Sequence, residues 1–369
     1  LRMFYINGKR IMKTICFFCG NLNHAGGTER VATSIANALA EKGYNILMLN
    51  LWEGDKPIFD LNKKIKSSQL YSQRVSFSKQ YLQTILKLRI FLKENQVDTL
   101  VVVESMLSLF SLPAKIGLVI NHITWEHFNY NVTLGQKGRA LSRHLSRLFS
   151  NKIVTLTEAD KQIWEKKTIG KAEIIAISNP SPYAISDHIP SQMNKTVLAV
   201  GRLTYQKGFD LLIQAWKLVK NEPHFSEWKL NIVGDGEDKA NLMKSIDVFN
   251  LGNSVTLFSF SYNINEFYLE ASLYCMSSRF EGLPMVLIEA QSFGLPIVSF
   301  NCDTGPSEIL DHNKSGFLCK PEDVSDLALK LKALMSLSEQ EYNGMGSYAK
   351  KSVSKFALDK IADKWEEIV

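Results

Sequence analysis

Residues 279–290 read RFEGLPMVLIEA, and they join an apolar run that ends near Met276 to a segment of helical periodicity. Pro284 suits the first turn of that helix, because its fixed φ and its missing N–H are tolerated there. Glu281 would then lie in the loop after a strand, and Glu289 about one turn inside the helix. Strand, loop and helix in this order are the unit of a parallel sheet covered by helices. The stretch predicts an α/β fold with two carboxylates near one strand end.

Short apolar runs and longer segments of helical period alternate in both directions from this stretch, which predicts parallel sheets throughout the chain. A cluster of helix and strand breakers at residues 178–190 predicts a linker, and 369 residues exceed what one core usually supports. The predicted strands cover residues 13–19, 45–51, 98–103, 117–123, 152–156, 174–177, 196–200, 229–233, 254–258, 272–276 and 296–299. The predicted parts are an N-terminal Rossmann-like domain at 12–185, a C-terminal one at 190–355, and a last helix at 356–369. The helical pattern of this last segment lets it pack on either domain, and we assign it to the N-terminal one.

The composition restricts where the protein works. The sequence has no run of about 18 apolar residues, and residues 1–11, which precede Met12, are expected to be a leader outside the fold. The five cysteines are an odd number scattered through apolar stretches, so core packing in a reducing compartment is favoured over disulfides. Cys16 and Cys19 form a C-x-x-C inside a strand-like run, where we expect them to pack in the core rather than to act in redox chemistry. We predict a cytoplasmic protein.

Positive charge is concentrated in the first half of the chain. Residues 1–185 hold 25 Lys and Arg against 13 Asp and Glu, whereas residues 186–369 hold 18 against 24. This asymmetry predicts that one domain faces an anionic partner such as a membrane surface, a lipid phosphate or a nucleic acid. Residues 137–149 carry Arg139, Arg143 and Arg147 on one helical face and leucines on the other. Two interpretations remain open for this helix: a basic anchor on an anionic membrane, or an ordinary helix with a solvated face.

Two further loops follow predicted strands, where parallel sheets bind ligands. Gly26 and Gly27 open a helix whose N-terminus can bind a phosphate, although paired glycines also open helices for the sake of the turn alone. Arg202 and Lys207 lie five residues apart in one loop and can hold a diphosphate, or they are solvated charges. Glu281 and Glu289 can accept hydrogen bonds from sugar and ribose hydroxyls. A surface coincidence is less favoured for Glu289, whose neighbours in the helix are apolar.

Taken together, these segments resemble the GT-B retaining glycosyltransferases of family 4, also called glycosyl transferases group 1, of the type that builds bacterial polysaccharide and lipopolysaccharide. The resemblance covers nearly the whole chain from Met12. It rests on the Gly26-Gly27 loop, the segment from Gly201-Arg202 to Lys207-Gly208, Val233-Gly234-Asp235-Gly236, the Glu281 and Glu289 pair, and Gly305-Pro306-Ser307-Glu308 with Gly316-Phe317. It implies two Rossmann-like domains whose parallel sheets face a central cleft.

The resemblance also implies the site. The implied catalytic residues are Arg202, Lys207, Glu281 and His127. The implied donor-binding residues are Gly26, Gly27, Gly201, Arg202, Lys207, Gly234, Glu281, Gly282, Leu283 and Glu289. On this reading Arg202 and Lys207 hold the diphosphate, Glu289 the ribose and Glu281 the donor sugar. His127 resembles the histidine near the donor sugar, although by itself a histidine between aromatic residues is more simply a packed one.

The implied reaction moves a hexose or N-acetylhexosamine from a nucleoside-diphosphate sugar, a UDP-sugar in preference to a GDP-sugar, to a saccharide or lipid-linked saccharide. It would serve cell-surface polysaccharide synthesis on the inner face of the cytoplasmic membrane. No metal is expected, because two preorganised cations can offset the charge of the leaving diphosphate. No cofactor or nucleic acid is expected either. Acceptor contacts are predicted at Glu104, Ser105, Trp125 and Tyr130, with Phe128 beside them.

Other functions remain open on the sequence. A GT-B nucleotide-sugar 2-epimerase would share the fold but fits the diphosphate loop and the glutamate pair less well. A nicotinamide-dependent oxidoreductase would need a glycine fingerprint that neither half shows convincingly. A non-enzymatic protein that binds a nucleotide sugar or a nucleic acid could use the basic half, but a nucleic-acid-binding protein leaves Glu281 and Glu289 without a role.

Overall fold

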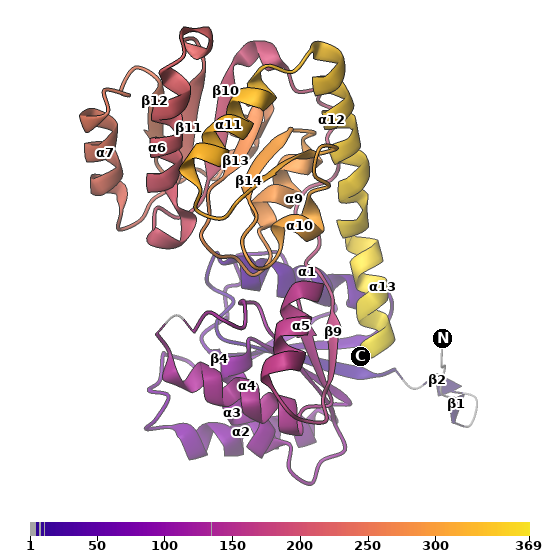
Figure 1. Ribbon diagram of the computed structural model, residues 1–369. Coiled ribbons are helices and arrows are strands. Elements are labelled where there is room, and N and C mark those ends of the chain that lie inside the picture. The colour runs from indigo at the N-terminus through magenta and orange to yellow at the C-terminus, as the bar shows by residue number, and fades with distance from the viewer. Residues whose placement is uncertain (1–4, 7–8, 11, 134) are drawn as a thin grey trace. The chain divides into compact units, whose positions relative to one another are not determined.

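The computed structural model describes residues 5–6, 9–10, 12–133 and 135–369, and they form two compact units (Figure 1). The first unit comprises Leu1–Pro180 together with Leu358–Val369, and the second comprises Ser181–Ala357. Most of the expected leader, residues 1–11, lies outside the described residues. Its described parts are two short strands, β1 (Tyr5–Ile6) and β2 (Lys9–Arg10), which pair antiparallel.

The first unit is built on a seven-stranded sheet in the order β5-β4-β3-β6-β7-β8-β9, and all its neighbouring strands are parallel. The strands are β3 (Thr14–Cys19), β4 (Asn45–Trp52), β5 (Lys66–Tyr71), β6 (Thr99–Val103), β7 (Asn121–Trp125), β8 (Lys152–Thr155) and β9 (Glu173–Ala176). The helices are α1 (Gly27–Glu41), α2 (Tyr81–Glu94), the 3₁₀ turn η1 (Ser105–Leu107), α3 (Ser108–Ala114), α4 (Lys137–Phe149), α5 (Glu158–Lys167) and α13 (Leu358–Ile368).

Alternating side chains divide the core of the first unit between the two faces of its sheet. Cys16 and Phe18 of β3 point to the face that α2 and α3 cover, where they meet Leu88 and Phe110. The intervening residues of β3 are equally buried and point to the opposite face, on the side of α1. The continuous apolar run of β3 follows from this burial on both faces.

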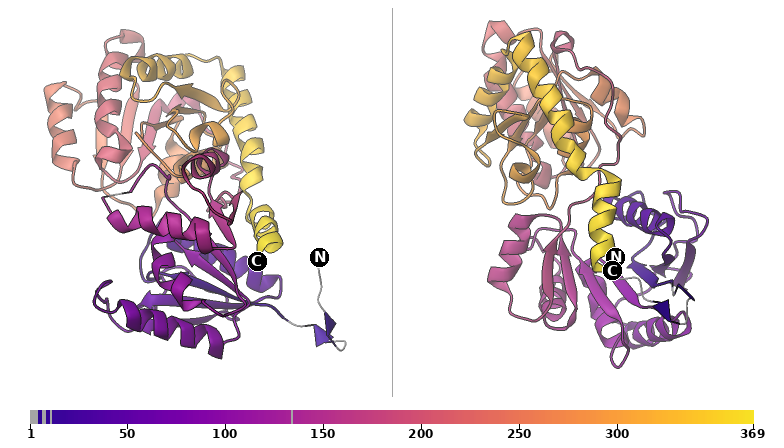
Figure 2. Two further views of the ribbon diagram at one scale, coloured as in Figure 1. Left: turned by 60° about the horizontal axis from the view of Figure 1, so that its bottom comes forward. Right: turned by 90° about the vertical axis from the view of Figure 1, so that its right-hand side faces the viewer.

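Helix α13 packs beside α1, although the two are far apart in sequence (Figures 1 and 2). Nζ of Lys42, at the end of α1, lies 2.5 Å from a carboxylate oxygen of Asp363 and 2.8 Å from one of Glu366. The ring of Trp365 lies 4.5 Å from that of Trp125, the last residue of β7. The sheet and α1 therefore pack against residues from the end of the sequence.

The second unit contains a six-stranded parallel sheet in the order β12-β11-β10-β13-β14-β15. Its strands are β10 (Thr196–Val200), β11 (Lys229–Val233), β12 (Val255–Phe258), β13 (Leu273–Met276), β14 (Ile297–Phe300) and β15 (Gly316–Cys319). The α-helices are α6 (Phe209–Lys220), α7 (Lys239–Val248), α8 (Ile264–Glu270), α9 (Met285–Ser292), α10 (Pro306–Ile309), α11 (Val324–Met335) and α12 (Glu339–Val353). The 3₁₀ turns are η2 (Gln192–Asn194), η3 (Tyr205–Lys207), η4 (Pro223–Phe225) and η5 (Ser354–Phe356).

The strand order gives each sheet a topological switch point, where the chain connections of two adjacent strands run toward opposite edges of the sheet. In the first unit it lies between β3 and β6, and in the second between β10 and β13. Loops diverge at such a point and leave a crevice beyond the carboxyl ends of the strands, where open α/β sheets bind ligands. The loops after these four strands therefore mark where each unit can hold a small molecule. None of the described helices has the length and apolar content that a membrane crossing requires.

One predicted strand was misplaced, and two strands of the large sheets were not predicted. β5 and β15 were missed because both are edge strands without a long apolar run, and most residues of β5 are exposed. The strand predicted at 117–123 is β7, at Asn121–Trp125. The apolar residues before Asn121 belong to the turn after α3, and Val119 within that turn is fully exposed. An apolar run therefore indicated a nearby strand without giving its limits.

Candidate functional site

In the second unit the loop after β10 is fastened to the loop after β13. Nε2 of Gln206 donates to the carbonyl of Phe280 at 3.0 Å, and the Arg279 N–H donates to the carbonyl of Gln206 at 2.8 Å. The hydroxyl of Ser277 donates to the carbonyl of Lys207 at 2.9 Å. The two loops on either side of the switch point are thus joined by backbone and side-chain hydrogen bonds. These bonds hold Lys207 of the first loop close to Glu281 of the second.

Lys207 and Glu281 form the ion pair at the centre of this arrangement. Nζ of Lys207 lies 2.6 Å from Oε1 of Glu281, whose side chain is almost fully buried. The hydroxyl of Thr304 donates to the carbonyl of Glu281 at 2.5 Å and fixes its backbone. The side chain of Arg202, from the same loop as Lys207, is exposed. The structure therefore brings Lys207 and Glu281 into contact. Arg202, which belongs to the same loop as Lys207, stays accessible to solvent.

Glu289 lies near the middle of α9, four residues after the helix begins at Met285. The hydroxyl of Tyr268 donates to Oε2 of Glu289 at 2.8 Å. The Tyr268 ring is itself stacked on Phe293, with centroids 5.0 Å apart. The carboxylate is thus held on a rigid aromatic support and is only partly exposed. Gly282 and Leu283 lie between the two glutamates in the chain, in the loop that enters α9, and Leu283 is buried.

Two glycines of the second unit are required by close backbone approaches. Gly234, after β11, has φ +154°, and a Cβ there would overlap the carbonyl oxygen of Gly201. Gly208, which opens α6, has φ +62°, and a Cβ there would overlap the carbonyl oxygen of Ser277. Both conformations are ones that residues with a side chain rarely adopt. These glycines therefore let the loops after β10, β11 and β13 pack directly on one another.

In the first unit Gly26 is the N-cap of α1 and Gly27 is its first residue. The carboxylate of Glu29 folds back over this helix start, where a Cβ at residue 26 would overlap it. The pKa of Glu29 is raised, chiefly because its carboxylate is buried, and the nearby His24 partly opposes this shift. The helix N-terminus thus has an anionic oxygen against it already. A phosphate bound here would take the position of this carboxylate.

Glu104 follows β6, on the other side of the switch point in the first unit. Its backbone has φ +88° and ψ 128°, which is unusual for a residue with a side chain and is the kind of strain found at functional sites. Its side chain is about 30% exposed, and Oε1 lies 2.9 Å from Nη2 of Arg139. Burial raises the pKa of Glu104, and the guanidinium of Arg139 opposes this shift. Glu104 therefore presents a partly exposed carboxylate that Arg139 holds from the buried side.

Two arginines of α4 are buried beneath the loops that follow β6 and β7. Arg139 is 2% exposed and Arg143 is 1% exposed. Nε of Arg143 lies 2.8 Å from Oε2 of Glu126, and Nη1 of Arg139 lies 3.6 Å from Oε1 of the same glutamate. Arg143 also donates to the carbonyls of Asn129 and Tyr130. The two guanidinium groups therefore neutralise the two carboxylates and fix the segment from residue 126 to residue 130.

His127 is the second residue after β7 and lies within this fixed segment. Its ring centroid is 4.6 Å from that of Trp125, and burial lowers the pKa of His127 to about 4. Nε2 has no hydrogen-bond partner among the described residues. Nε2 is also buried, so this neutral imidazole can exchange a hydrogen bond only with a ligand hydroxyl that reaches into the space around it. The packed-histidine reading also fits its contact with Trp125.

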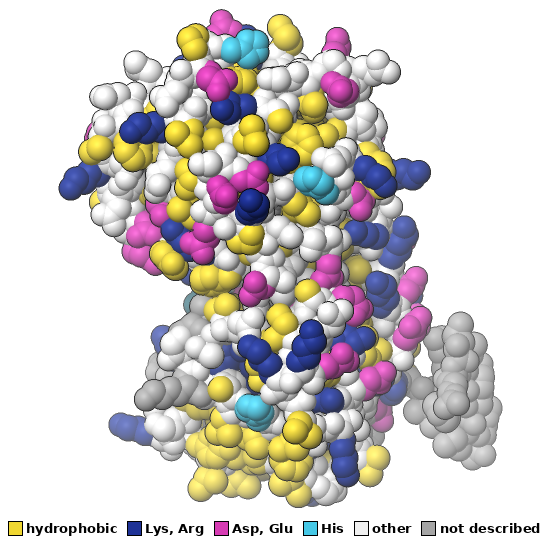
Figure 3. Space-filling model, in the orientation of Figure 1, with side chains coloured by type: hydrophobic (Ala, Val, Ile, Leu, Met, Phe, Trp, Pro, Cys, Tyr) yellow, Lys and Arg dark blue, Asp and Glu magenta, His cyan; other side chains and the backbone are white. Residues whose placement is uncertain are grey.

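The structure corrects the predictions for the acceptor contacts and for the basic helix. Ser105 and Trp125 are completely buried, so their side chains have no surface to offer an acceptor. The hydroxyl of Ser105 instead donates to Glu126 at 2.7 Å. The arginine face of residues 137–149 points inward, so Arg139 and Arg143 cannot lie on a membrane. Figure 3 shows apolar side chains on the surface in this region, whereas the prediction placed the basic side chains there.

Tyr130 and Phe128 keep part of their surface. Tyr130 is half-buried, with its ring 5.1 Å from that of Trp164 and its N–H donating to Asp160 at 2.8 Å. Burial raises the pKa of Asp160 to about 7. The Phe128 ring lies 4.4 Å from the guanidinium carbon of Arg139, and its outer part is exposed. Of the aromatic residues predicted to stack on a sugar, these two therefore retain an accessible edge.

Arg279, which was not among the predicted site residues, organises the loops after β10 and β13. Its guanidinium makes two hydrogen bonds to the carboxylate of Asp210, at 2.9 and 2.7 Å, and one to the carbonyl of Tyr205 at 2.7 Å. It also lies 4.0 Å from the Tyr205 ring centroid. Arg279 begins the RFEG segment, so its position beside Glu281 was a signal. Its partner Asp210 lies almost seventy residues earlier, and only the fold reveals that pairing.

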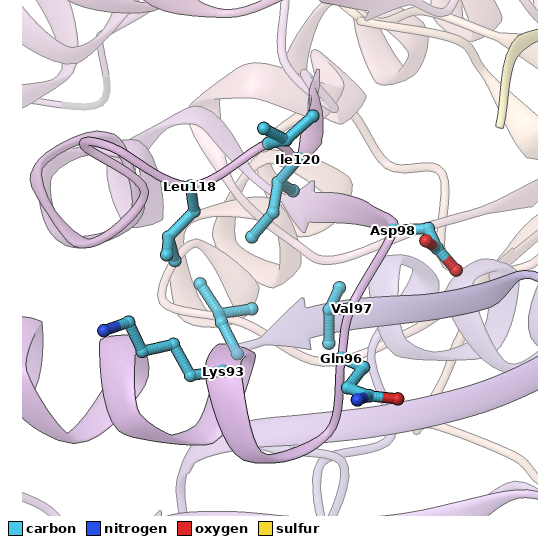
Figure 4. A pocket seen from close by; sticks show the side chains of 8 residues that line it. Lys93, Gln96, Val97, Asp98, Leu118 and Ile120 are labelled. Carbon is cyan, nitrogen blue, oxygen red and sulfur yellow. The ribbon is translucent and has the colours of Figure 1, made fainter.

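One described cavity, of about 350 Å³, lies away from these loops (Figure 4). It is formed by residues that precede β6 and β7, at the amino ends of the strands and therefore opposite the end that carries Glu104 and His127. Its lining residues are Leu92, Lys93, Gln96, Val97, Asp98, Leu118, Val119 and Ile120. It has no part in the candidate site.

Two Rossmann-like units, each with its crevice at a switch point, define the GT-B class of glycosyltransferases. Solved structures share the fold along the whole chain. The lipopolysaccharide outer core galactosyltransferase WaaB matches with a TM-score of 0.79 and 20% identity, over 96% of this chain and 98% of that one. HepE of Anabaena, solved in complex with UDP, matches with a TM-score of 0.79 and 19% identity, over 96% and 99%.

Sequence comparison gives the family. The family models match as "Glycosyltransferase Family 4" over residues 25–180 and "Glycosyl transferases group 1" over residues 185–352. An uncharacterized glycosyltransferase of Haemophilus influenzae is 37% identical over 97% of this chain and its own full length. The amylovoran biosynthesis glycosyltransferase AmsD of Erwinia amylovora is 29% identical, over 97% of this chain and all of its own. A Campylobacter jejuni α-1,4-N-acetyl-D-galactosaminyltransferase, named for an acceptor on undecaprenyl diphosphate, is 26% identical over 97% and 98%. The chain belongs to the group 1, family 4 glycosyltransferases.

Proposed function

We propose that this glycosyltransferase moves a hexose or N-acetylhexosamine, with retention of configuration, from a UDP-sugar to a saccharide or lipid-linked saccharide in cell-surface polysaccharide synthesis. The observation that carries the proposal is the Lys207–Glu281 pair at the switch point of the second unit, with the exposed Arg202 in the same loop. Two cations and a carboxylate beyond the strand ends suit a diphosphate and a sugar hydroxyl together. The donor-binding roles of Gly26, Gly27, Gly201, Gly234, Gly282 and Leu283 belong to the same proposal.

The proposed reaction breaks the bond between C1 of the donor sugar and its diphosphate oxygen. The acceptor oxygen bonds to C1 on the same face, and its proton passes to the departing phosphate oxygen. Negative charge grows on the diphosphate as the bond breaks, and Arg202 with Lys207 would stabilise it as an oxyanion site does. No protein nucleophile, metal or cofactor is required by this scheme. Glu281 would orient Lys207 in the resting enzyme and accept a hydroxyl of the donor sugar when it is bound.

The relatives support the class of substrate. HepE was solved with UDP, AmsD is named for the synthesis of an exopolysaccharide, and the Campylobacter enzyme is named for a lipid-linked acceptor. We therefore place a lipid-linked saccharide among the acceptors and the protein at the inner face of the cytoplasmic membrane. On the acceptor side, Glu104 has a partly exposed carboxylate and a strained backbone that suit a sugar hydroxyl. His127 would contact the donor sugar through its neutral imidazole.

The test is a panel of UDP- and GDP-sugars assayed for release of the nucleoside diphosphate, with a mixture of lipid-linked saccharides as acceptor. One UDP-sugar should give release that depends on acceptor, and Arg202→Ala should abolish most of it. Anomeric analysis of the product by NMR should show the configuration of the donor. A product of inverted configuration would contradict retention, and interconversion of free UDP-sugars without transfer would identify an epimerase instead.

A further inference from the structure

Helix α4 is inverted relative to an ordinary surface helix. Its buried side carries Arg139, Ser142, Arg143 and Ser146, whereas Leu141, Leu148 and Phe149 on the other side are each about half exposed, at 47–58%. A surface helix normally buries its apolar stripe and exposes its charges. The buried arginines are explained by their pairing with Glu104 and Glu126. No contact among the described residues of the first unit explains the exposed apolar stripe.

Helix α2 presents a second exposed apolar stripe. Leu82, Leu86 and Ile90, spaced one turn apart, are 54–73% exposed, while Leu88 and Leu92 of the same helix fill the core beneath. The helix is therefore apolar on two sides, although one apolar side is enough to hold it on the sheet. The outer stripe adds nothing to the fold of the unit.

The two stripes lie on helices that both pack against α3. The hydroxyl of Tyr81 in α2 donates to the carbonyl of Leu109 in α3 at 2.9 Å, and the start of α4 at Gly138 packs against the side chain of Leu109. Helix α3 thus separates α2 from α4 and offers Leu109 and Pro113, both half-buried, between the stripes. Apolar side chains gather over these helices low in the view of Figure 3. We call the surface made by Leu82, Leu86, Ile90, Leu141, Leu148 and Phe149 the apolar face.

The charge around the apolar face selects its partner. Residues 79–151, which contain α2, α3 and α4, hold nine Lys and Arg against four Asp and Glu, and two of these four, Glu104 and Glu126, pair with the buried arginines. Lys79, two residues before α2, and Lys93, in the last turn of α2, are exposed. A second copy docked on this face would bring two basic rims together, which is unfavourable. An anionic lipid surface would accept the apolar side chains and attract the cations at once.

We propose that the apolar face enters the headgroup region of an anionic membrane, with Lys79 and Lys93 contacting lipid headgroups. This rests on the proposed function, in which the acceptor is linked to a lipid, and it names the surface that meets the bilayer. The buried arginines fix α4 with its apolar side toward solvent. The apolar side chains are therefore the ones that contact lipid.

The experiment measures sedimentation of the full chain with vesicles of equimolar phosphatidylcholine and phosphatidylglycerol, in the absence of any nucleotide sugar. The wild type should bind, and the triple variants Leu82→Gln, Leu86→Gln, Ile90→Gln and Leu141→Gln, Leu148→Gln, Phe149→Gln should each bind at least about tenfold more weakly. The matched control replaces three equally exposed apolar residues of the second unit, Met243, Val248 and Leu329, with Gln, and should bind like the wild type. Lys79→Gln with Lys93→Gln should weaken binding and reduce its dependence on salt.

Equal vesicle binding by the wild type and the apolar-face variants, or no binding by the wild type, would overturn the proposal. Analytical ultracentrifugation of the same proteins supplies the other decisive outcome: a wild-type dimer that the apolar-face variants dissociate would make a second copy the partner. Circular dichroism melting of each variant establishes that it is folded. UDP binding by calorimetry on the same samples reports separately on the proposed function, because loss of UDP binding leaves the vesicle result standing and the reverse is also true.

Discussion

Nε of Arg143 lies 2.8 Å from Oε2 of Glu126, and both side chains are at most 1% exposed. The pair joins α4 to the end of β7 and fixes the segment that carries His127. A buried ion pair contributes little net stability compared with apolar packing, but the loss of one partner leaves an uncompensated buried charge. The pair is therefore sensitive to single substitutions and informative about which way α4 faces.

Arg143→Met should lower the free energy of unfolding by about 3–5 kcal/mol, because Glu126 then keeps its charge without its closest partner. Denaturant unfolding followed by circular dichroism measures this. His144→Met, on the exposed side of the same helix, is the control and should change stability by less than about 0.5 kcal/mol. Equal stability of the two variants would mean that the arginine face is solvated after all.

Arg202→Ala should lower kcat/KM about a hundredfold while the fold stays intact, since its side chain is exposed and is proposed to act on charge that grows in the transition state. Thermal unfolding and steady-state kinetics with the active donor give the two readings. Lys239→Ala is the matched control, because Lys239 follows β11 in the same unit and pairs with Asp235 at the surface. Wild-type turnover by Arg202→Ala would place the diphosphate elsewhere.

Glu289→Gln should weaken UDP binding by roughly 1 kcal/mol, because a charge-assisted hydrogen bond to a ribose hydroxyl would become a neutral one. Isothermal titration calorimetry measures the affinity. Tyr268→Phe removes the hydroxyl that donates to Glu289 but keeps the carboxylate, and it should weaken binding less. An unchanged affinity in Glu289→Gln would remove this residue from the ribose site.

His122 should make the protein less stable as the pH falls. It is completely buried, its Nε2 lies 2.8 Å from the hydroxyl of Ser111, and burial lowers its pKa from 6.5 to about 3. Between pH 6.5 and about pH 3, this histidine binds a proton in the unfolded chain but stays neutral in the folded chain. Stability from this group is therefore complete above pH 6.5 and declines toward pH 3, by up to about 1.4 kcal/mol for each pH unit.

Unfolding free energies of the wild type and His122→Asn, measured between pH 7 and pH 5, test this. The variant should show a shallower decline than the wild type, and His144→Asn on the exposed side of α4 controls for loss of an imidazole. Parallel curves for wild type and His122→Asn would show that His122 is not the group responsible.

The residues proposed for the donor could be located from the sequence because they follow strands. Arg202, Lys207 and Glu281 come directly after β10 and β13, and strand ends are visible as the ends of apolar runs. The structure confirms the parallel α/β architecture, and it brings Lys207 and Glu281 within hydrogen-bonding distance. Their roles toward a donor stay predictions. The Arg279–Asp210 pair could not be found, because nothing local couples the two residues.

Helix α4 shows where sequence periodicity reaches its limit. The spacing of arginines and leucines correctly separated two faces, but periodicity does not say which face is buried. That choice was made by Glu104 and Glu126, which lie on different strand ends and come near α4 only in the fold. Edge strands β5 and β15 were missed for a related reason, because a strand exposed at the rim of a sheet does not need an apolar run.

The packing of α13 in the first unit has a consequence for the order in which the protein can fold during synthesis. On the ribosome, Trp125 and α1 are made long before Trp365, Asp363 and Glu366, and the whole second unit is translated in between. Until α13 is made, part of the apolar surface of the nascent first unit therefore stays uncovered. Exposed apolar surface of this kind binds chaperones or leads to aggregation. A ribosome that stalls before Leu358 would leave a finished second unit tethered to an unfinished first one.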